Sequence, residues 1–286
     1  MCRLLGVTRS LVYYKPTPHK VDVELENAVI EEFNNNRKAF GTIKLKRALK
    51  RRDKPLHASR RRIGKIMKKY NLVSKYVQRR KRKKAGNADA DIVNNEVKPN
   101  LVERKWDERK PLEVIVSDLT YVKVNSQWHY ICLLVDIAAR EIIGFAAGRN
   151  KDAKLVRKAI YRADVDLRGI DIFHTDRGGE FKNEILDDII HAFGMRRSLS
   201  AKGTPVDNAV MESLYNSVKA ELVYGETFHT LADLELELFQ FVHWYNNARP
   251  HGGLGLLTPK EYKALLKERN QGGNGEMRSI AATSNY

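Results

Sequence analysis

The chain has 286 residues, of which 42% are hydrophobic and 30% charged, with two cysteines and a formal net charge of +17. The length allows a catalytic core and a smaller module, whereas two cysteines are too few for a disulfide framework and no apolar run is long enough for a membrane span or a secretion signal. We expect a soluble, intracellular protein, and a charge this positive indicates either a polyanionic partner or a membrane surface.

The positive charge is concentrated in the first part of the chain. Residues 1–110 contain 31 Lys and Arg against 12 Asp and Glu, a net charge of +19, whereas residues 111–286 contain 21 against 23, a net charge of −2. This asymmetry is typical of a nucleic-acid-binding region that precedes a near-neutral, acid-bearing domain. A solvated charged surface without a partner is the alternative.

Residues 1–22 are predicted to be a helical lead-in. A turn at Gly6 and Val7 is followed by Thr8 as the cap of a helix, which is the second half of a helix-turn-helix pattern. The first half is missing. Either the segment is a short lead-in, or the chain begins where a longer protein would continue.

Residues 23–78 are predicted to form a helix-turn-helix-like DNA-binding domain. Apolar residues recur at helical spacing over 23–33, Thr42 is the expected cap of a second helix, and Ser59 is the expected cap of a third. A plain helical bundle with a basic surface is the alternative. The third helix leaves its cations outside its apolar stripe, and those predicted to contact DNA are Arg60, Arg61, Lys65 and Lys68.

Residues 79–110 are predicted to be a basic and polar linker. The linker begins with six consecutive cations, which repel one another unless phosphates neutralise them. The polar stretch 85–98 has little to bury and is expected to be flexible. The predicted DNA contacts of the linker are Arg79, Arg80, Lys81, Arg82, Lys83 and Lys84.

Residues 111–269 are predicted to form an α/β domain with a mixed sheet. Alternating apolar patterns predict strands at 113–117, 121–124, 128–135 and 141–147, and shorter strands at 170–174 and 195–198. Helical patterns lie at 152–163, 183–192, 206–223, 231–246 and 259–269. Asn125 and Ser126 are expected to make a tight turn, Cys132 is expected to be a buried thiol, and residues 270–286 are predicted to be a disordered tail.

Three carboxylates stand out in this domain. Asp118 follows a run of Val and Ile, Asp176 follows the short strand at 170–174 in a glycine-containing turn, and Glu212 lies on the helix at 206–223. An acid at the end of an apolar strand is costly to bury unless it is paired or binds a metal ion. Any such triple is a weak signal in a chain with 35 acids.

The helix that carries Glu212 is predicted to have one functional face and one apolar face. The expected functional face consists of Asn208, Glu212, Tyr215, Asn216 and Lys219, and the expected apolar face contains Val210, Leu214 and Val218. Lys219 lies two turns beyond Glu212, where it could reach a phosphate. Two strand acids and one helix acid suit a pair of Mg²⁺ ions about 3.5–4 Å apart around a phosphodiester.

Several sequence motifs, in order, resemble those of one family. The segments 117–122, 174–178 and 203–222 resemble the three acidic motifs of the second-reading-frame (OrfB-type) DDE transposases of bacterial IS3-like insertion sequences, with 35 residues between Asp176 and Glu212. The run 245–251, followed by Leu254, Thr258, Pro259 and Tyr262, resembles the C-terminal signature of this family, and 40–43 resembles part of its helix-turn-helix segment.

This resemblance implies a ribonuclease-H-like integrase core with a mixed five-stranded sheet, preceded by an all-α helix-turn-helix region. It implies a DNA transposase that depends on Mg²⁺, or Mn²⁺ as a substitute, and performs donor-end cleavage and strand transfer. Asp118, Asp176 and Glu212 would bind the metal and act in catalysis with Lys219, and Asn208 and Lys219 would contact DNA. No structural zinc is expected, because no paired His and Cys module precedes the core.

The resemblance also implies partners and a location. They are DNA at the element ends and at the target, further copies of the chain in a homo-multimer on that DNA, and a first-frame transposase protein or a fusion with it. A cytoplasmic, nucleoid-associated bacterial protein without membrane contact is expected.

Two other functions remain open. A non-enzymatic DNA-binding regulator of transposition would keep the fold without metal-dependent cleavage, and a structure-selective or RNA-cutting nuclease would share the metal chemistry. His174, next to Thr175 and Asp176, is either a catalytic base or a residue that orients its neighbours, and the second role is favoured.

Overall fold

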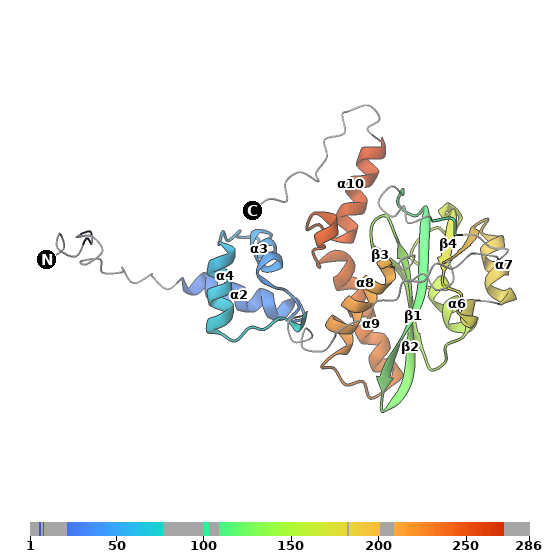
Figure 1. The fold of residues 1–286 in the computed structure, drawn as a ribbon, viewed down its shortest axis with the longest axis horizontal. Helices are drawn as coiled ribbons and strands as arrows, with labels where there is room; N and C mark the ends of the chain where they lie inside the picture. The colour runs from blue at the N-terminus through green and yellow to red at the C-terminus, as the bar shows by residue number, and fades with distance from the viewer. Residues whose placement is uncertain are drawn as a thin grey trace.

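In the computed structural model, the part of the chain that is described forms a helical domain and an α/β domain (Figure 1). The structure describes residues 6, 8, 22–76, 100–102, 109–181, 183–200 and 209–271. Nearly all of the predicted lead-in, the six consecutive cations and Asn208 lie outside these residues. Across the described ranges, no helix has both the length and the apolar character needed to cross a membrane.

The helical domain consists of α2 (Val23–Asn35), α3 (Thr42–Lys50) and α4 (Arg60–Lys69). The side chain of Ser59 accepts a hydrogen bond from the backbone N–H of Arg62 and caps α4 as predicted, whereas the N-cap of α3 is Gly41 and Thr42 is its first residue. The apolar stripes of the three helices meet in one core, which includes Leu25, Val29, Phe33, Phe40, Leu45, Leu49, Ile63 and Ile66. The three predicted helices are confirmed.

The α/β domain contains a mixed sheet with the strand order β3-β2-β1-β4-β5. The strands are β1 (Val114–Val124), β2 (Gln127–Asp136), β3 (Glu141–Gly148), β4 (Ile172–Thr175) and β5 (Arg196–Leu199). The first three strands pair antiparallel, and β4 and β5 run parallel to β1. The predicted mixed five-stranded sheet is confirmed.

The first strand differs from its prediction. The sequence suggested two strands, at 113–117 and 121–124, because Asp118 and Thr120 interrupt the apolar pattern. Strand β1 is continuous, since it pairs with β2 without a break from Ile115–Asp136 to Val124–Gln127. Backbone pairing to a neighbouring strand tolerates polar side chains, which a hydrophobicity pattern cannot reveal. The predicted turn at Asn125 and Ser126 is confirmed by their positive φ angles of 44° and 66°.

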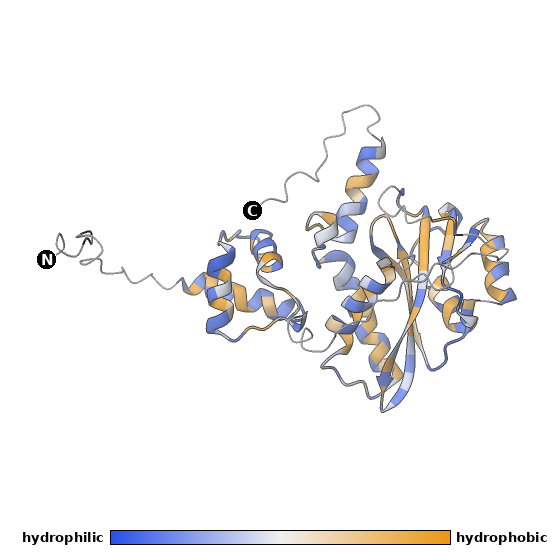
Figure 2. Ribbon diagram, in the orientation of Figure 1, coloured by the Kyte–Doolittle hydropathy of each residue, from blue (hydrophilic) through white to orange (hydrophobic). Residues whose placement is uncertain are grey.

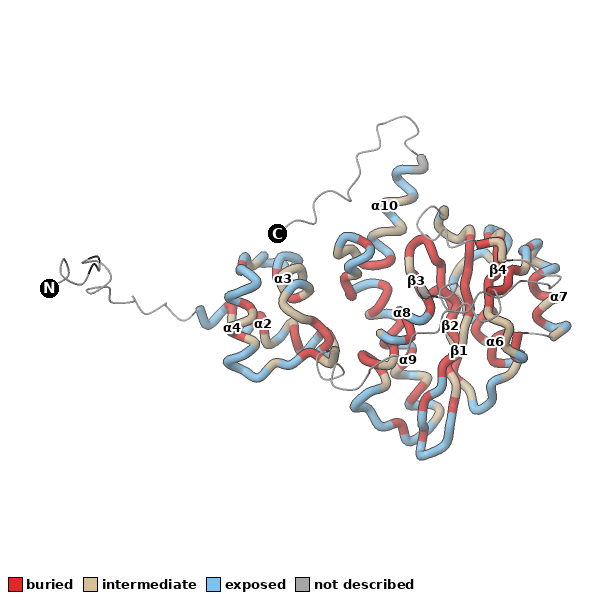
Figure 3. Tube along the Cα trace, in the orientation of Figure 1, coloured by how far each residue is buried: buried red, intermediate tan, exposed pale blue. Residues whose placement is uncertain are grey.

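Helices cover both faces of the sheet (Figures 1 and 3). On one face lie α8 (Ala209–Val218), the π-helix η5 (Lys219–Val223) and α9 (Leu231–Asn247); on the other lie α6 (Ala153–Tyr161) and α7 (Glu184–Ala192). The described residues of this domain also form α10 (Pro259–Gln271) and the short 3-10 helices η2 (Leu167–Gly169), η3 (Gly179–Phe181) and η6 (Gly252–Leu254). The single helix predicted at 206–223 therefore changes its winding at Lys219.

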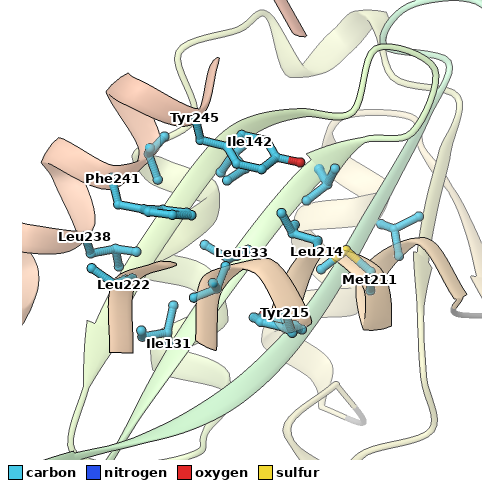
Figure 4. Close-up of a cluster of buried hydrophobic side chains, with 14 of the residues drawn as sticks. Ile131, Leu133, Ile142, Met211, Leu214, Tyr215, Leu222, Leu238, Phe241 and Tyr245 are labelled. Atoms are coloured by element: carbon cyan, nitrogen blue, oxygen red, sulfur yellow. The ribbon is translucent and has the colours of Figure 1, made fainter. Parts of the chain in front are cut away.

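Buried apolar side chains form a core between the sheet and α8, η5 and α9. Figure 4 shows Leu214 and Leu222 facing Leu133 of β2, with Phe241 of α9 beside them. All four side chains are buried. Burial of a large apolar side chain stabilises by about 1.5–3 kcal/mol, so this core fixes α8 against the strands.

Gly144 of β3 lies in close contact with α6. A Cβ atom at this position would lie 2.6 Å from the backbone oxygen of Ala159 and 2.7 Å from Cδ1 of Leu134. Gly144→Ala is therefore expected to lower the free energy of unfolding by about 1–3 kcal/mol in urea denaturation, because α6 has to move. Gly169→Ala is the matched control, since nothing lies within 4 Å of its Cβ; equal stabilities of the two variants would contradict this close contact.

Polar contacts join the helical domain to α9, α10 and the chain that follows η5. Trp244 Nε1 donates to Asn36 Oδ1 at 3.1 Å, and its ring lies 5.9 Å from that of Phe40. Further ion pairs between the two domains are Arg37–Glu237 at 2.9 Å, Arg51–Glu261 at 2.6 Å and Lys75–Glu226 at 3.0 Å. These contacts orient the helical domain relative to the α/β domain.

Candidate active site

Asp118 and Asp176 lie at the same level of two neighbouring parallel strands. The last residues paired between β1 and β4 are Ser117 and Thr175, and each aspartate is the next residue along its strand. Strand β4 ends at Thr175, so β1 has no paired neighbour on the β4 side from Asp118 onward. The sequence suggested that Asp118 ends the first strand. In the structure Asp118 lies in the middle of β1, level with the point where β4 ends.

Backbone N–H groups hold both carboxylates. Leu119 N donates to Oδ1 of Asp118 at 2.7 Å, and Gly178 N donates to Oδ1 of Asp176 at 2.9 Å. Such hydrogen bonds to an ionised carboxylate are stronger than those between neutral groups. Each aspartate therefore has one oxygen fixed by its own loop or strand.

The environment of Asp118 disfavours its negative charge. Burial raises the pKa of Asp118 to about 7, and the neighbouring carboxylates of Asp176 and Glu180 add to the rise, while the N–H of Leu119 and the ammonium of Lys151 oppose it. A carboxyl group that is buried beside other acids is stabilised in its ionised form by a cation. The electrostatics of this site therefore suit a bound cation.

Glu180 is a third acid near Asp118 that the sequence did not single out for the site. Its buried carboxylate lies 2.8 Å from Nζ of Lys151. The loop allows this position because Gly178 has no side chain, since a Cβ there would lie 2.5 Å from Oε1 of Glu180. The only sequence signal was an Asp and a Glu four residues apart in one glycine-containing loop, and nothing in the sequence pointed to Lys151.

Glu212 does not join the two aspartates in this structure. Its side chain is exposed on α8, and among the described residues no three His, Cys, Asp or Glu side chains are close enough to hold a metal ion together. Helix α8 nevertheless contacts β1, because the hydroxyl of Tyr215 donates to the backbone carbonyl of Asp118. Glu212 lies one turn before Tyr215.

The predicted division of α8 into two faces is wrong at one position. Tyr215 was assigned to the functional face, but its side chain is buried with Met211, Leu214 and Val218 against the sheet (Figure 4). Helical spacing places Tyr215 at the border of both faces, and only packing decides which one it joins. Its hydroxyl still reaches the backbone of Asp118.

Lys219 begins the π-helix η5, a type of winding that is rare and often occurs at functional sites. Its Nζ lies 4.6 Å from the centre of the Tyr121 ring on β1. Sequence spacing placed Lys219 on the face of Glu212, but its contact with Tyr121 could not be foreseen.

His174 has a structural environment. Its ring is fully buried in β4, with Nδ1 2.8 Å from the hydroxyl of Ser198 and Nε2 3.0 Å from the hydroxyl of Ser200. Both ring nitrogens are thus engaged with hydroxyl groups. This arrangement favours the orienting role over that of a catalytic base.

The four predicted DNA contacts of the helical domain lie on the solvent side of α4. Arg60, Arg61, Lys65 and Lys68 are exposed. Two other cations near them are engaged within the domain: Arg62 lies 3.1 Å from Asp22, and Lys69 lies 2.7 Å from Glu26. The folded domain therefore presents the predicted set, while Arg79 to Lys84 and Asn208 lie outside the described residues.

The residues of the C-terminal signature have structural roles. The guanidinium of Arg249 pairs with the buried carboxylate of Glu221 at 2.8 Å and donates to the hydroxyl of Tyr76 at 2.8 Å. Asn246 binds both the N–H and the carbonyl of Ile142 on β3, at 3.0 and 2.8 Å. The signature thus ties α9 to η5, to the edge strand and to the chain that leaves the helical domain.

The matches to known protein families fall on the helical domain and on the α/β domain separately. Residues 20–82 match a family described as an HTH-like domain, and residues 108–205 and 193–259 match two families that are both described as an integrase core domain. The chain is 27% identical over 257 residues to the transposase for insertion sequence element IS904 of Lactococcus lactis subsp. lactis (strain IL1403), which covers 88% of this chain and 98% of that protein. It is also 27% identical over 282 residues to transposase InsF for insertion sequence IS3A of Escherichia coli (strain K12), with 92% of each covered.

Solved structures of viral integrases are similar at low sequence identity. The catalytic core domain of HTLV-2 integrase in complex with magnesium is 12% identical, with a TM-score of 0.43, and the match covers 54% of this chain and 97% of that one. The catalytic core domain of BIV integrase is 18% identical, with a TM-score of 0.41 and coverages of 56% and 99%.

Proposed function

Because this chain belongs to the IS3-like insertion-sequence transposases and carries an integrase core behind a helix-turn-helix-like domain, we propose that it cleaves the ends of its element and joins them to target DNA. Both steps are metal-dependent displacements at phosphodiesters. The observation that carries the proposal is the placement of Asp118 and Asp176 at the end of the β1–β4 pairing.

The donor set fits a divalent cation of the Mg²⁺ or Mn²⁺ type. Asp118 and Asp176 supply hard carboxylate oxygens, and burial, followed by the nearby carboxylates of Asp176 and Glu180, raises the pKa of Asp118, so that a bound cation would stabilise its ionised form. We propose Glu212 as the third ligand, on the basis of its position on the helix that contacts β1. When bound, two such ions supply Lewis-acid activation of the attacking hydroxyl and stabilisation of the leaving 3′ oxygen.

The remaining residues position DNA. Lys219 would bind a phosphate near the carboxylates, and Asn208 would contact DNA at the start of the same helix. The exposed cations of α4, namely Arg60, Arg61, Lys65 and Lys68, would bind the duplex backbone together with the six cations from Arg79 to Lys84.

The domain organisation that we propose follows these roles. Residues 23–78 bind DNA, residues 79–110 link the two domains, and residues 111–269 perform catalysis, with a lead-in at 1–22 and a tail at 270–286. The matches of an HTH-like domain to 20–82 and of the integrase core to 108–259 support boundaries close to these. Because two element ends must be joined, a homo-multimer on DNA is proposed, with a first-frame protein or a fusion supplying further end recognition.

A strand-joining assay tests the proposed function. The full chain, incubated with a labelled duplex of its own element end and a target plasmid, is expected to produce joined DNA with Mg²⁺ or Mn²⁺ and none in excess EDTA. DNA binding in EDTA should persist, because α4 and the linker carry it through phosphate contacts that need no metal. Joining that continues in EDTA would rule out metal-dependent chemistry.

One observation favours a second candidate function. Among the described residues, Glu212 does not form a metal-binding cluster with Asp118 and Asp176. A DNA-binding regulator that keeps the fold without catalysis would need no such cluster. Such a protein would bind the element end with a strong salt dependence and give no joined product with either metal. The same assay therefore separates the two functions.

A further inference from the structure

Four side chains on the β1–β2 hairpin and η5 form a row in which two neighbouring aromatic rings have a lysine at each end. Nζ of Lys219 lies 4.6 Å from the ring centre of Tyr121, and the Tyr121 and Trp128 rings stand edge to face at 5.1 Å. Nζ of Lys123 lies 5.0 Å from the centre of the Trp128 ring. We call this set the hairpin row; it runs from the start of η5 onto the hairpin, which extends beyond the helices at the bottom of Figure 1.

The hairpin row is open to solvent. Tyr121 is 56% exposed and Trp128 is 52% exposed, and the hairpin tip is hydrophilic and exposed around them (Figures 2 and 3). Among the residues that the structure describes, no carboxylate lies within ion-pair distance of Lys123 or Lys219. The row therefore presents unneutralised positive charge beside two accessible rings.

The stability of the hairpin does not by itself require two lysines and two exposed aromatic residues in this row. Lys123 and Trp128 are direct cross-strand partners, and such a pair stabilises a hairpin by only about 0.2–1 kcal/mol. A protein-docking surface would also use aromatic residues, but lysine is depleted in such interfaces. Two exposed rings flanked by lysines instead match a single-stranded nucleic acid, whose phosphates need cations and whose unpaired bases stack on aromatic side chains.

We propose that the hairpin row binds single-stranded DNA next to the catalytic carboxylates, with unpaired bases stacked on Tyr121 and Trp128 and phosphates held by Lys123 and Lys219. Tyr121 follows Asp118 by three residues on β1, about 10 Å along the strand, and the odd spacing points the two side chains to opposite faces of the sheet. Both lie on the part of β1 that β4 leaves unpaired after Thr175, and Lys219 of η5 reaches the Tyr121 ring there. A strand that leaves the carboxylates along β1 would meet the row within a few nucleotides. This inference rests on the proposed function, since an element end must open locally for its bases to become unpaired.

Binding measurements on the full chain test the hairpin row. Fluorescence anisotropy in EDTA, with a labelled oligothymidine of about 20 nucleotides and a duplex of equal length, reports the two affinities without cleavage. Trp128→Ala and Tyr121→Ala are each expected to weaken single-strand binding by about five- to a hundredfold, and duplex binding by less than about twofold. Tyr161→Ala on α6 is the matched control, since Tyr161 is 69% exposed and lies outside the row; it should leave both affinities unchanged.

Two further variants separate stacking and charge from hairpin stability. Trp128→Phe keeps a flat ring and should restore most of the single-strand affinity that Trp128→Ala loses. Lys123→Gln should reduce the slope of log K against log salt for the single strand by about 0.7, the amount for one phosphate contact. Thermal unfolding of each variant checks that the fold is retained.

The outcomes distinguish this inference from the proposed function. Parental single-strand affinity in Trp128→Ala and Tyr121→Ala, or an equal loss for single strand and duplex, would overturn the row as a single-strand site. Tighter binding of oligouridine than of oligothymidine would overturn the assignment to DNA. Strand joining by the parent chain with Mg²⁺ is scored separately, so the transposase function can hold while the row fails, or the reverse.

Discussion

Glu212→Gln is expected to reduce strand joining by at least about a hundredfold, because the substitution removes the charge of the proposed third metal ligand, which would act in the transition state. The free energy of unfolding should change by less than about 0.5 kcal/mol, since the Glu212 side chain is exposed. DNA binding in EDTA should be unchanged. Joining assays, urea denaturation and anisotropy measure the three quantities on the same preparation.

The matched control for this substitution is Glu184→Gln. Glu184 is also an exposed acid in the first part of a helix, α7, on the opposite face of the sheet. It should join DNA at the parental rate, whereas Asp118→Asn and Asp176→Asn should fail like Glu212→Gln. Normal joining by Glu212→Gln, with loss in both aspartate variants, would show that another acid completes the site, and Glu180, which lies near Asp118, would be the first residue to test.

Arg249→Leu is expected to lower the free energy of unfolding by about 3–5 kcal/mol. Glu221 and Arg249 are almost completely buried, with 0% and 7% of their side chains exposed, and removal of the guanidinium leaves a buried carboxylate without its partner. The hydroxyl of Tyr76 and that of Ser217 would lose a donor as well. Urea denaturation of the full chain measures the loss.

Two comparisons make this prediction specific. Arg168→Ala removes an exposed pair with Asp166, in which 79% and 62% of the side chains are exposed, and should cost less than about 1 kcal/mol. The double variant Glu221→Leu with Arg249→Leu should recover most of the stability, because apolar residues of similar volume often replace a buried ion pair without loss. A small effect of Arg249→Leu alone, close to that of Arg168→Ala, would mean that water reaches the Glu221 carboxylate.

The buried pair also lies close to Lys219, which we propose binds a phosphate, since Glu221 lies two residues beyond Lys219 in η5. The backbone carbonyl of Glu221 accepts hydrogen bonds from Arg37 at 3.4 Å and Lys75 at 3.5 Å, which both come from the helical domain. The segment that carries Lys219 is thus attached to the domain predicted to bind DNA. Arg249, a residue of the C-terminal signature to which the sequence assigned no chemical role, pairs with Glu221 and so stabilises the contact between η5 and the helical domain.

The sequence by itself determined the local elements of this protein and its family. Helical and alternating periodicity, the Ser59 cap and the turn at Asn125 and Ser126 are encoded within a few neighbouring residues, and so the three-helix domain and the mixed sheet were predictable. The motifs around Asp118, Asp176 and Glu212, followed in order by the C-terminal signature at 245–262, carried the resemblance to transposases. Their role as ligands stays a prediction, because the structure brings only the two aspartates together.

Only the tertiary structure decided which distant residues meet. The parallel pairing of β1 with β4 sets Asp118 level with Asp176, and packing against the sheet turns Tyr215 into the core while Glu212 stays exposed. The contacts of Glu180 with Lys151 and of Lys219 with Tyr121 likewise join segments far apart in the chain. Periodicity specifies which face of an element is apolar, but the partner of each face depends on register and on the packing of side chains from several elements at once.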